Sequence, residues 1–152
     1  MNNPIPQRPM GAVRQPAATI IRPRYDEPSA VRIHERMAYF SPPLVNDDNW
    51  NEMVLQREKP VAVVFTMVGC AACTSLKKTS IQILKNHYRD SLEIVEFQCS
   101  PQTVMDKELD ATGHPSIIFF NKGVEVGVYL GYSQAEYYIN YIKTNRAIGL
   151  NR

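Results

Sequence analysis

The stretch VVFTMVGCAACTSLKK, residues 63–78, carries an apolar run directly into two cysteines that are separated by two residues. The run itself starts earlier, and over residues 61–67 it is continuous and rich in β-branched side chains. Such a run predicts a strand that is buried on both faces of a sheet. After the cysteines, apolar residues recur near helical spacing as far as residues 86–90. Cys70 and Cys73 therefore fall where a strand gives way to a helix.

This position gives the two thiols different chemistry. Two intervening residues suffice to bring the sulfurs within bonding distance when Cys70 lies in the turn and Cys73 in the first helical turn. Cys70 then meets the free N–H groups and the positive end of the helix dipole, which stabilise a thiolate. We expect Cys70 to be the nucleophile, and Cys73 to be the resolving thiol that attacks a mixed disulfide.

The remaining patterns predict an α/β domain. The expected strands cover residues 36–45, 92–99, 116–120 and 124–130, the first being a short edge strand interrupted by Pro42 and Pro43. The expected helices cover residues 46–60, 105–113 and 133–145, the last capped by Ser133. The NKG tripeptide between the last two strands is a hairpin signal. The order β-α-β-α-β-α-β-β-α predicts a mixed sheet with helices on both faces.

The first part of the chain has a different composition. Of the 152 residues, 1–30 hold six of the eleven prolines and one aromatic residue. Residues 1–34 carry five arginines against two acidic residues, a net charge of +3, whereas the remainder has a net charge of −1. We expect an extended Pro/Arg-rich arm over residues 1–36, disordered or docked on a partner, followed by a domain over 37–152.

Composition also bears on location and partners. No run of 18 apolar residues and no signal-peptide pattern occur, so neither a membrane span nor secretion is expected. The expected location is cytoplasmic, or within a virion or another large assembly formed in the cytoplasm. The arginines of residues 1–34 alternate with prolines and not with aromatic residues, which favours a protein partner over nucleic acid.

Several motifs occur in the order that is found in the thioredoxin family. VNDDNWNEMV at residues 45–54 resembles the start of the family's first helix, and VAVVFTMVGCAAC at 61–73 its central strand and active site. ATGHPSIIFFNKGVEV at 111–126 is similar to the cis-proline segment and hairpin, and YLGYSQAEYYINYI at 129–142 to the glycine and last helix. The resemblance implies a thioredoxin-like fold, a mixed central sheet flanked by helices.

The same resemblance implies the residues of the site. Cys70 and Cys73 would be the redox pair, and Pro115 the cis-proline whose loop lies against them. His114 would offer its backbone to an extended substrate chain, and Gly131 would line the substrate groove. No cofactor is implied.

The chain departs from the family at four places. Gly69, a candidate substrate-binding residue, stands where the family usually has tryptophan, and Ala71-Ala72 replaces Gly-Pro. Val64 occupies the position of the family's buried aspartate, and Lys78 stands near that of a helix-kinking proline. Without the aspartate, the second cysteine has no obvious internal base. We therefore expect a specialised protein and not a general disulfide reductase.

Other interpretations of the chemically active residues stay open. Cys99 ends the strand expected beside the CxxC strand, so it is either a possible accessory thiol or a buried free cysteine. The His114 side chain could exchange protons or simply be solvated. Zinc on Cys70, Cys73, Cys99 and His114 would need a second close ligand pair, which the sequence lacks, so no metal is predicted.

Two functions follow from these features. The first is a thioredoxin-like thiol–disulfide oxidoreductase or redox switch, with a protein substrate bound in the groove at Cys70 and Pro115. The second is a structural or accessory subunit of a large assembly, for example a virion particle, which is anchored by residues 1–34 and has vestigial or regulatory cysteines. The sequence favours the enzyme in a partner-bound setting.

Overall fold

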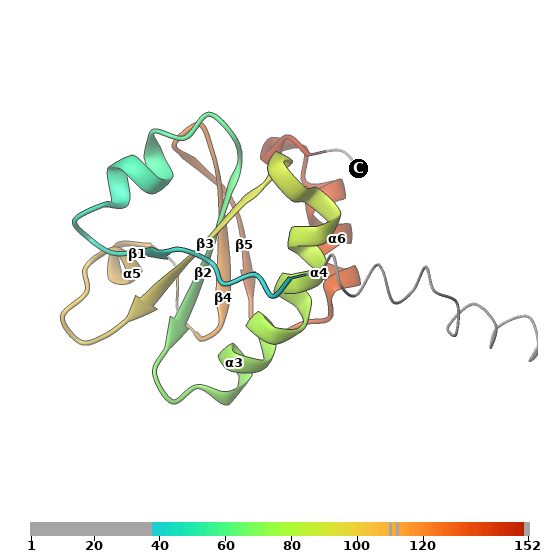
Figure 1. The fold of residues 1–152 in the computed structure, drawn as a ribbon. Helices are drawn as coiled ribbons and strands as arrows, with labels where there is room; N and C mark the ends of the chain where they lie inside the picture. The colour runs from blue at the N-terminus through green and yellow to red at the C-terminus, as the bar shows by residue number, and fades with distance from the viewer. Residues whose placement is uncertain (1–37, 110, 112, 151–152) are drawn as a thin grey trace, which may run out of the picture. The chain divides into compact units, whose positions relative to one another are not determined.

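A computed structural model of the chain describes residues 38–109, 111 and 113–150, and the predicted arm lies outside them. The described residues form a five-stranded sheet with helices packed against it (Figure 1). Its strands are β1 (Leu44–Val45), β2 (Val61–Met67), β3 (Glu93–Cys99), β4 (Ser116–Asn121) and β5 (Val124–Leu130). They lie in the order β1-β3-β2-β4-β5.

The sheet is mixed, as the sequence predicts. β3 runs parallel to both β1 and β2, whereas β4 runs antiparallel to β2 and to β5. The connection from β2 to β3 passes through helices, and β4 and β5 form the predicted hairpin. β2 therefore lies at the centre, with its carboxyl end next to the start of β4.

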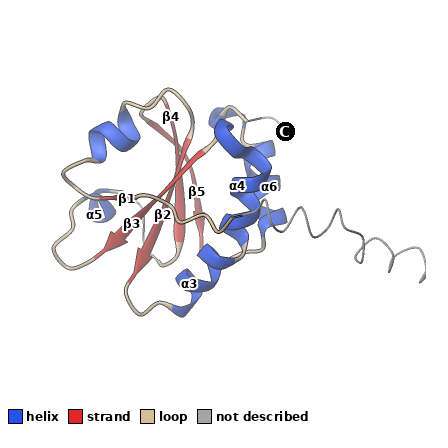
Figure 2. Cartoon of the chain, in the orientation of Figure 1, coloured by secondary structure: helices blue, strands red, loops and turns tan. Residues whose placement is uncertain are grey.

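Helices cover both faces of the sheet (Figure 2). The helices on one face are α3 (Ala71–Lys78), α4 (Ser80–Tyr88) and α6 (Ala135–Thr144). The π-type helix η1 (Asn51–Leu55) and α5 (Met105–Glu108) contribute to the other core. Two short 3₁₀ turns, η2 (Arg89–Ser91) and η3 (Arg146–Ile148), follow α4 and α6.

β2 separates two hydrophobic cores because its alternate side chains enter opposite faces. Ala62 and Val64 pack beneath α4 and α6. Val63 and Phe65 face the other core, which is centred on Trp50. The continuous apolar run is thus explained by burial on both faces, as predicted.

Two predicted elements are much shorter in the structure. The helix expected over 46–60 is reduced to η1, because the Asn46 side chain accepts hydrogen bonds from the backbone N–H groups of Asp48 and Asn49 and holds a turn there. The edge strand expected over 36–45 pairs only at Leu44–Val45. Prolines just before β1 have no N–H to donate to the ladder.

The predicted capping of the last helix by Ser133 is wrong. Gln134 precedes α6 without a side-chain hydrogen bond to the helix. The Ser133 hydroxyl is engaged with the Tyr129 hydroxyl at 2.9 Å, and its carbonyl accepts from Ser80 Oγ at 2.6 Å. The serine therefore ties β5 and α4 together. The helix expected over 105–113 also ends earlier, at Glu108.

The helix expected after the cysteines is divided in two at Thr79, whose backbone (φ −117°, ψ −83°) is not helical. The Thr79 hydroxyl donates to the Ser75 carbonyl at 2.7 Å, and Gln82 Nε2 donates to the Lys77 carbonyl at 2.8 Å. The Ser75 carbonyl also accepts the Thr79 backbone N–H at 3.0 Å, so the carbonyls at the end of α3 are hydrogen-bonded despite the break. The chain thus bends at this point without a proline.

Candidate redox site

The site begins in the turn that follows β2. Cys70 N–H donates to the Met67 carbonyl at 3.2 Å and closes this turn. Gly69 has φ +83°, a conformation that favours glycine. A Cβ atom at Gly69 would meet nothing within 4 Å, so the space beside the first cysteine is open.

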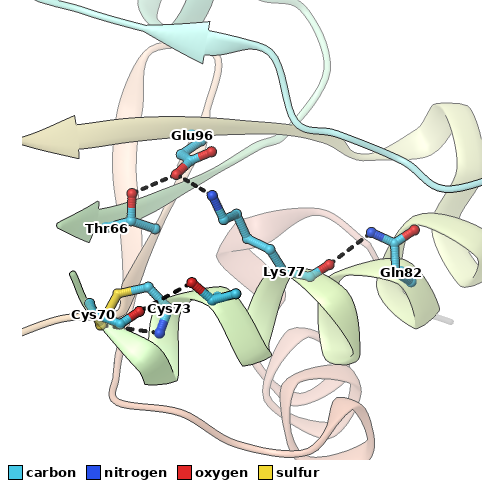
Figure 3. Close-up of polar contacts among 7 residues, drawn as sticks. Thr66, Cys70, Cys73, Lys77, Gln82 and Glu96 are labelled. Atoms are coloured by element: carbon cyan, nitrogen blue, oxygen red, sulfur yellow. Dashed lines mark hydrogen bonds and ion pairs between the residues drawn. A yellow bond between two sulfur atoms is a disulfide. The ribbon is translucent and has the colours of Figure 1, made fainter. Parts of the chain in front are cut away.

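Cys70 and Cys73 form a disulfide across the first turn of α3, with their Cα atoms 5.2 Å apart (Figure 3). Cys70 is the N-cap residue of the helix, and its Sγ accepts a hydrogen bond from the Cys73 N–H at 3.1 Å. Cys70 is half-buried, whereas Cys73 is only 2% exposed. The predicted pairing is confirmed, and the accessible sulfur is the one at the helix N-terminus.

A second segment meets the same end of the sheet. The peptide bond between His114 and Pro115 is cis. The Pro115 carbonyl accepts from Gly131 N–H at 2.8 Å, and Gly131 has φ +84°. Since Ser116 pairs with Phe65 near the carboxyl end of β2, both segments lie at the edge from which the disulfide turn leaves the sheet.

A buried carboxylate lies under α3. Glu96, in the middle of β3, is 4% exposed. Its Oε2 accepts from Thr66 Oγ1 at 2.6 Å and from Lys77 Nζ at 2.8 Å, as Figure 3 shows. This group was not predicted from the sequence. An acidic residue inside an otherwise apolar strand was a signal, but the partner Lys77 stands 19 residues away.

The family model for thioredoxin matches residues 41–144. The chain belongs to the thioredoxin family. A search of curated proteins finds no significant match. The thioredoxin domain with its Cys70–Cys73 disulfide is a thioredoxin-like redox module.

The buried carboxylate of this thioredoxin domain lies on a different strand from the aspartate that the family resemblance led us to expect. Val64 on β2 pairs in register with Glu96 on β3. A carboxylate is therefore present at the same level of the sheet, one strand away. The prediction that the second cysteine has no obvious internal base was made from Val64 alone, without Glu96.

Cys99 ends β3 of the thioredoxin domain and is paired in register with Met67. It is 4% exposed, and burial, together with nearby Asp106, raises the pKa of its thiol to about 12. The thiol is therefore protonated at neutral pH and a weak nucleophile. It lines an apolar cavity of about 470 Å³ with Met67 and Val68, next to the disulfide turn. These features favour the buried-cysteine interpretation, and the accessory role stays a prediction.

The imidazole of His114 has one nitrogen enclosed by protein. His114 Nε2 is buried and has no hydrogen-bond partner among residues 38–109, 111 and 113–150. The residue as a whole is half-buried. Its backbone precedes the cis bond, as the family resemblance implies, and a role for the side chain stays a prediction.

The described part of the chain shows neither a metal-binding group nor a membrane-spanning helix. Within it, no group of three or more His, Cys, Asp or Glu side chains is arranged to hold a metal ion. The alternative zinc set is not assembled there, since Cys70 and Cys73 are joined to each other. Among the same residues, no helix has both the length and the apolar character needed to cross a membrane.

Proposed function

We propose that the protein is a thiol–disulfide oxidoreductase or redox switch that acts on a protein disulfide in a specialised, partner-bound setting. The observation that carries the proposal is the asymmetric disulfide, with a half-buried Cys70 at the start of α3 and a buried Cys73 one turn inside. An incoming thiolate or client disulfide reaches the first sulfur more easily than the second.

In the reduced protein, Cys70 is the attacking group. Its thiolate accepts a hydrogen bond from the Cys73 N–H and lies at the positive end of the helix dipole. Both interactions stabilise the negative charge. It attacks one sulfur of the client disulfide, and the other client sulfur leaves as a thiolate. Cys70 and the client are then joined by a mixed disulfide.

Cys73 completes the exchange. Its thiol loses a proton and attacks Cys70 Sγ, so the Cys70–Cys73 bond forms and the second client sulfur is released as a thiol. Two electrons have passed from the dithiol to the client, and an external dithiol must restore the reduced form. The burial of Cys73 keeps competing thiols away from it.

The segment around the cis bond is the proposed client-binding surface. His114, Pro115 and Gly131 lie at the sheet edge from which the disulfide turn leaves. We expect an extended client chain to pair with the His114 backbone there, as in strand addition to a sheet. The space beside Gly69 is also open, which fits a bulky protein client.

The proposed activity is tested by reduction of insulin disulfides with dithiothreitol as the reductant. The wild-type protein should accelerate precipitation of the insulin B chain, and Cys70→Ser should abolish the acceleration because the attacking sulfur is lost. Cys99→Ala is the matched cysteine control and should retain activity. Wild-type activity no higher than that of Cys70→Ser would reject the proposal.

The partner-bound part of the proposal rests on the composition of residues 1–34, with their net charge of +3 and their many prolines. A chain of this kind can bind along an acidic protein surface and becomes ordered only on docking. A truncated protein that lacks residues 1–34 should unfold at the same temperature as the full chain. It should no longer co-sediment with the large assembly, for example a virion particle, to which these residues are proposed to anchor the domain. Unchanged co-sedimentation would count against an anchoring role and against the structural-subunit alternative.

A further inference from the structure

The sheet has two edges, and they differ in how much backbone they present. The edge strand β1 pairs at only two residues, and Pro42 and Pro43 stand directly before it. The other edge strand, β5, has seven residues and pairs with β4 on one side. No strand among residues 38–109, 111 and 113–150 pairs with its other side. β5 therefore presents a long outer edge, whereas β1 presents almost none.

The sequence of β5 favours self-association at this edge. The strand VEVGVYL has one charged residue and no proline, and most of its side chains are β-branched or aromatic. Segments of this kind pair readily with further copies of themselves when they lie on an exposed edge. Val124 and Leu130, at its two ends, are 61% and 55% exposed. A register shift in the β4–β5 ladder between Phe119 and Phe120 bends the strand but leaves its outward backbone groups in place.

Two side chains from the C-terminal end of α6 occupy the middle of this edge. Val128 N–H donates to the Tyr141 hydroxyl at 3.0 Å. Asn145 Nδ2 donates to the Val126 carbonyl at 2.9 Å. These two backbone groups are bonded to side chains and not to β4, so they belong to the outer edge. If β5 strands of two copies paired antiparallel around Gly127, the Val128 N–H of one copy would donate to the Val126 carbonyl of the other.

Gly127 is the residue that permits this arrangement. A Cβ atom there would lie 2.6 Å from the Tyr141 hydroxyl and 2.7 Å from Asn145 Nδ2, which is closer than atoms can approach without a shift. Glycine weakens the interior of a strand, and it often marks a place where another group comes close to the backbone. Here the two side chains cross the strand at the one residue that has no side chain of its own.

We propose that the outer edge of β5 is a strand-pairing surface for a second copy of the chain, and that Tyr141 and Asn145 keep it closed. Each of the two side chains makes a hydrogen bond that a second β5 strand would otherwise make. The pairing would be isologous, because the same strand of each copy lies on both sides of a twofold axis. The inference goes beyond the proposed redox function and does not depend on it.

Both side chains can be changed while their other contacts are kept. Tyr141→Phe removes one oxygen and keeps the ring, whose centroid lies 5.7 Å from that of Phe119 and 5.4 Å from that of Tyr129. Asn145 Oδ1 also accepts from the Ala147 N–H as the N-cap of η3. Asn145→Ser keeps an oxygen suited to that cap but is too short to reach β5.

The test is the mass of the oxidised full-length protein in solution, measured by light scattering and sedimentation as its concentration is raised. The double variant Tyr141→Phe/Asn145→Ser should reach twice the mass of the wild type, because the pairing groups of β5 become available. Tyr137→Phe/Asn140→Ser is the matched control, since both residues are exposed on the same helix. The control should keep the mass of the wild type at every concentration.

Hydrogen exchange separates strand pairing from a loss of stability. In the paired form a second strand covers the outward amides of β5, so their exchange should slow as the concentration rises. A purely structural role predicts the reverse, with faster exchange, a lower unfolding temperature and an unchanged mass. Adding Val124→Lys to the double variant should restore the wild-type mass, because a lysine on an edge opposes strand pairing. Val124 is exposed enough to accept the change.

Two results would overturn the proposal. One is a folded double variant that keeps the wild-type mass up to its limit of solubility, and the other is a dimer in which the exchange of β5 does not slow. If the double variant does not fold, Tyr141→Phe alone decides, because it removes a single oxygen. Self-association of that variant with slower exchange in β5 would support the proposal, and its absence would overturn it.

Discussion

Replacing Trp50 by alanine is expected to lower the free energy of unfolding by about 3–5 kcal/mol. The side chain is 5% exposed, and its ring centroid lies 5.5 Å from that of Phe120, 5.9 Å from that of Phe97 and 6.3 Å from that of Phe65. Removing it leaves a cavity between η1 and the sheet and takes three aromatic contacts away. Since domains are stable by only about 5–15 kcal/mol, this loss is a large share of the total.

The measurement is urea unfolding followed by circular dichroism, because Trp50 is the only tryptophan and the variant loses that fluorescence signal. Tyr137→Ala is the matched aromatic control. Tyr137 is 57% exposed on α6, so its loss should change the free energy of unfolding by about 0.5 kcal/mol or less. Equal losses for the two variants would show that Trp50 does not anchor this core.

The sequence predicts the centre of the fold better than its edges. The bounds expected for the central strand, residues 61–67, are those of β2, because an uninterrupted apolar run has few alternatives to a doubly buried strand. The same reasoning places the CxxC pair at the start of α3. By contrast, the helix expected over 46–60 shrinks to η1, since the Asn46 side chain competes for backbone N–H groups. Local hydrogen bonding of this kind is hard to weigh from composition alone.

Features made by distant residues were not predictable. The sequence shows the loss of an aspartate at Val64, but only the β2–β3 register brings Glu96 to the same level of the sheet. The break at Thr79 is a similar case. It depends on Gln82, which bonds both the Lys77 carbonyl and the Phe40 backbone across 42 residues. No local pattern reports such long-range contacts.

Replacing Gly123 by alanine is expected to lower the free energy of unfolding by about 3 kcal/mol, from roughly 1–2 kcal/mol for a left-handed backbone and roughly 1–3 kcal/mol for overpacking. Gly123 lies in the β4–β5 hairpin with φ +82°. An added Cβ would lie 2.5 Å from the Leu55 carbonyl oxygen at the end of η1. Because that atom belongs to the backbone, the hairpin or η1 must move to make room.

Gly69→Ala separates the two contributions, because Gly69 has nearly the same φ of +83° but open space around the added carbon. It should cost only the backbone term, about 1–2 kcal/mol. Both variants are compared with the wild type by urea unfolding of the oxidised protein, so that the disulfide is the same in each. If Gly123→Ala is no more destabilising than Gly69→Ala, the hairpin does not pack against η1 as closely as described. A larger loss of unfolding free energy for Gly123→Ala would instead show that the β4–β5 hairpin packs closely against η1, the helix that follows Trp50.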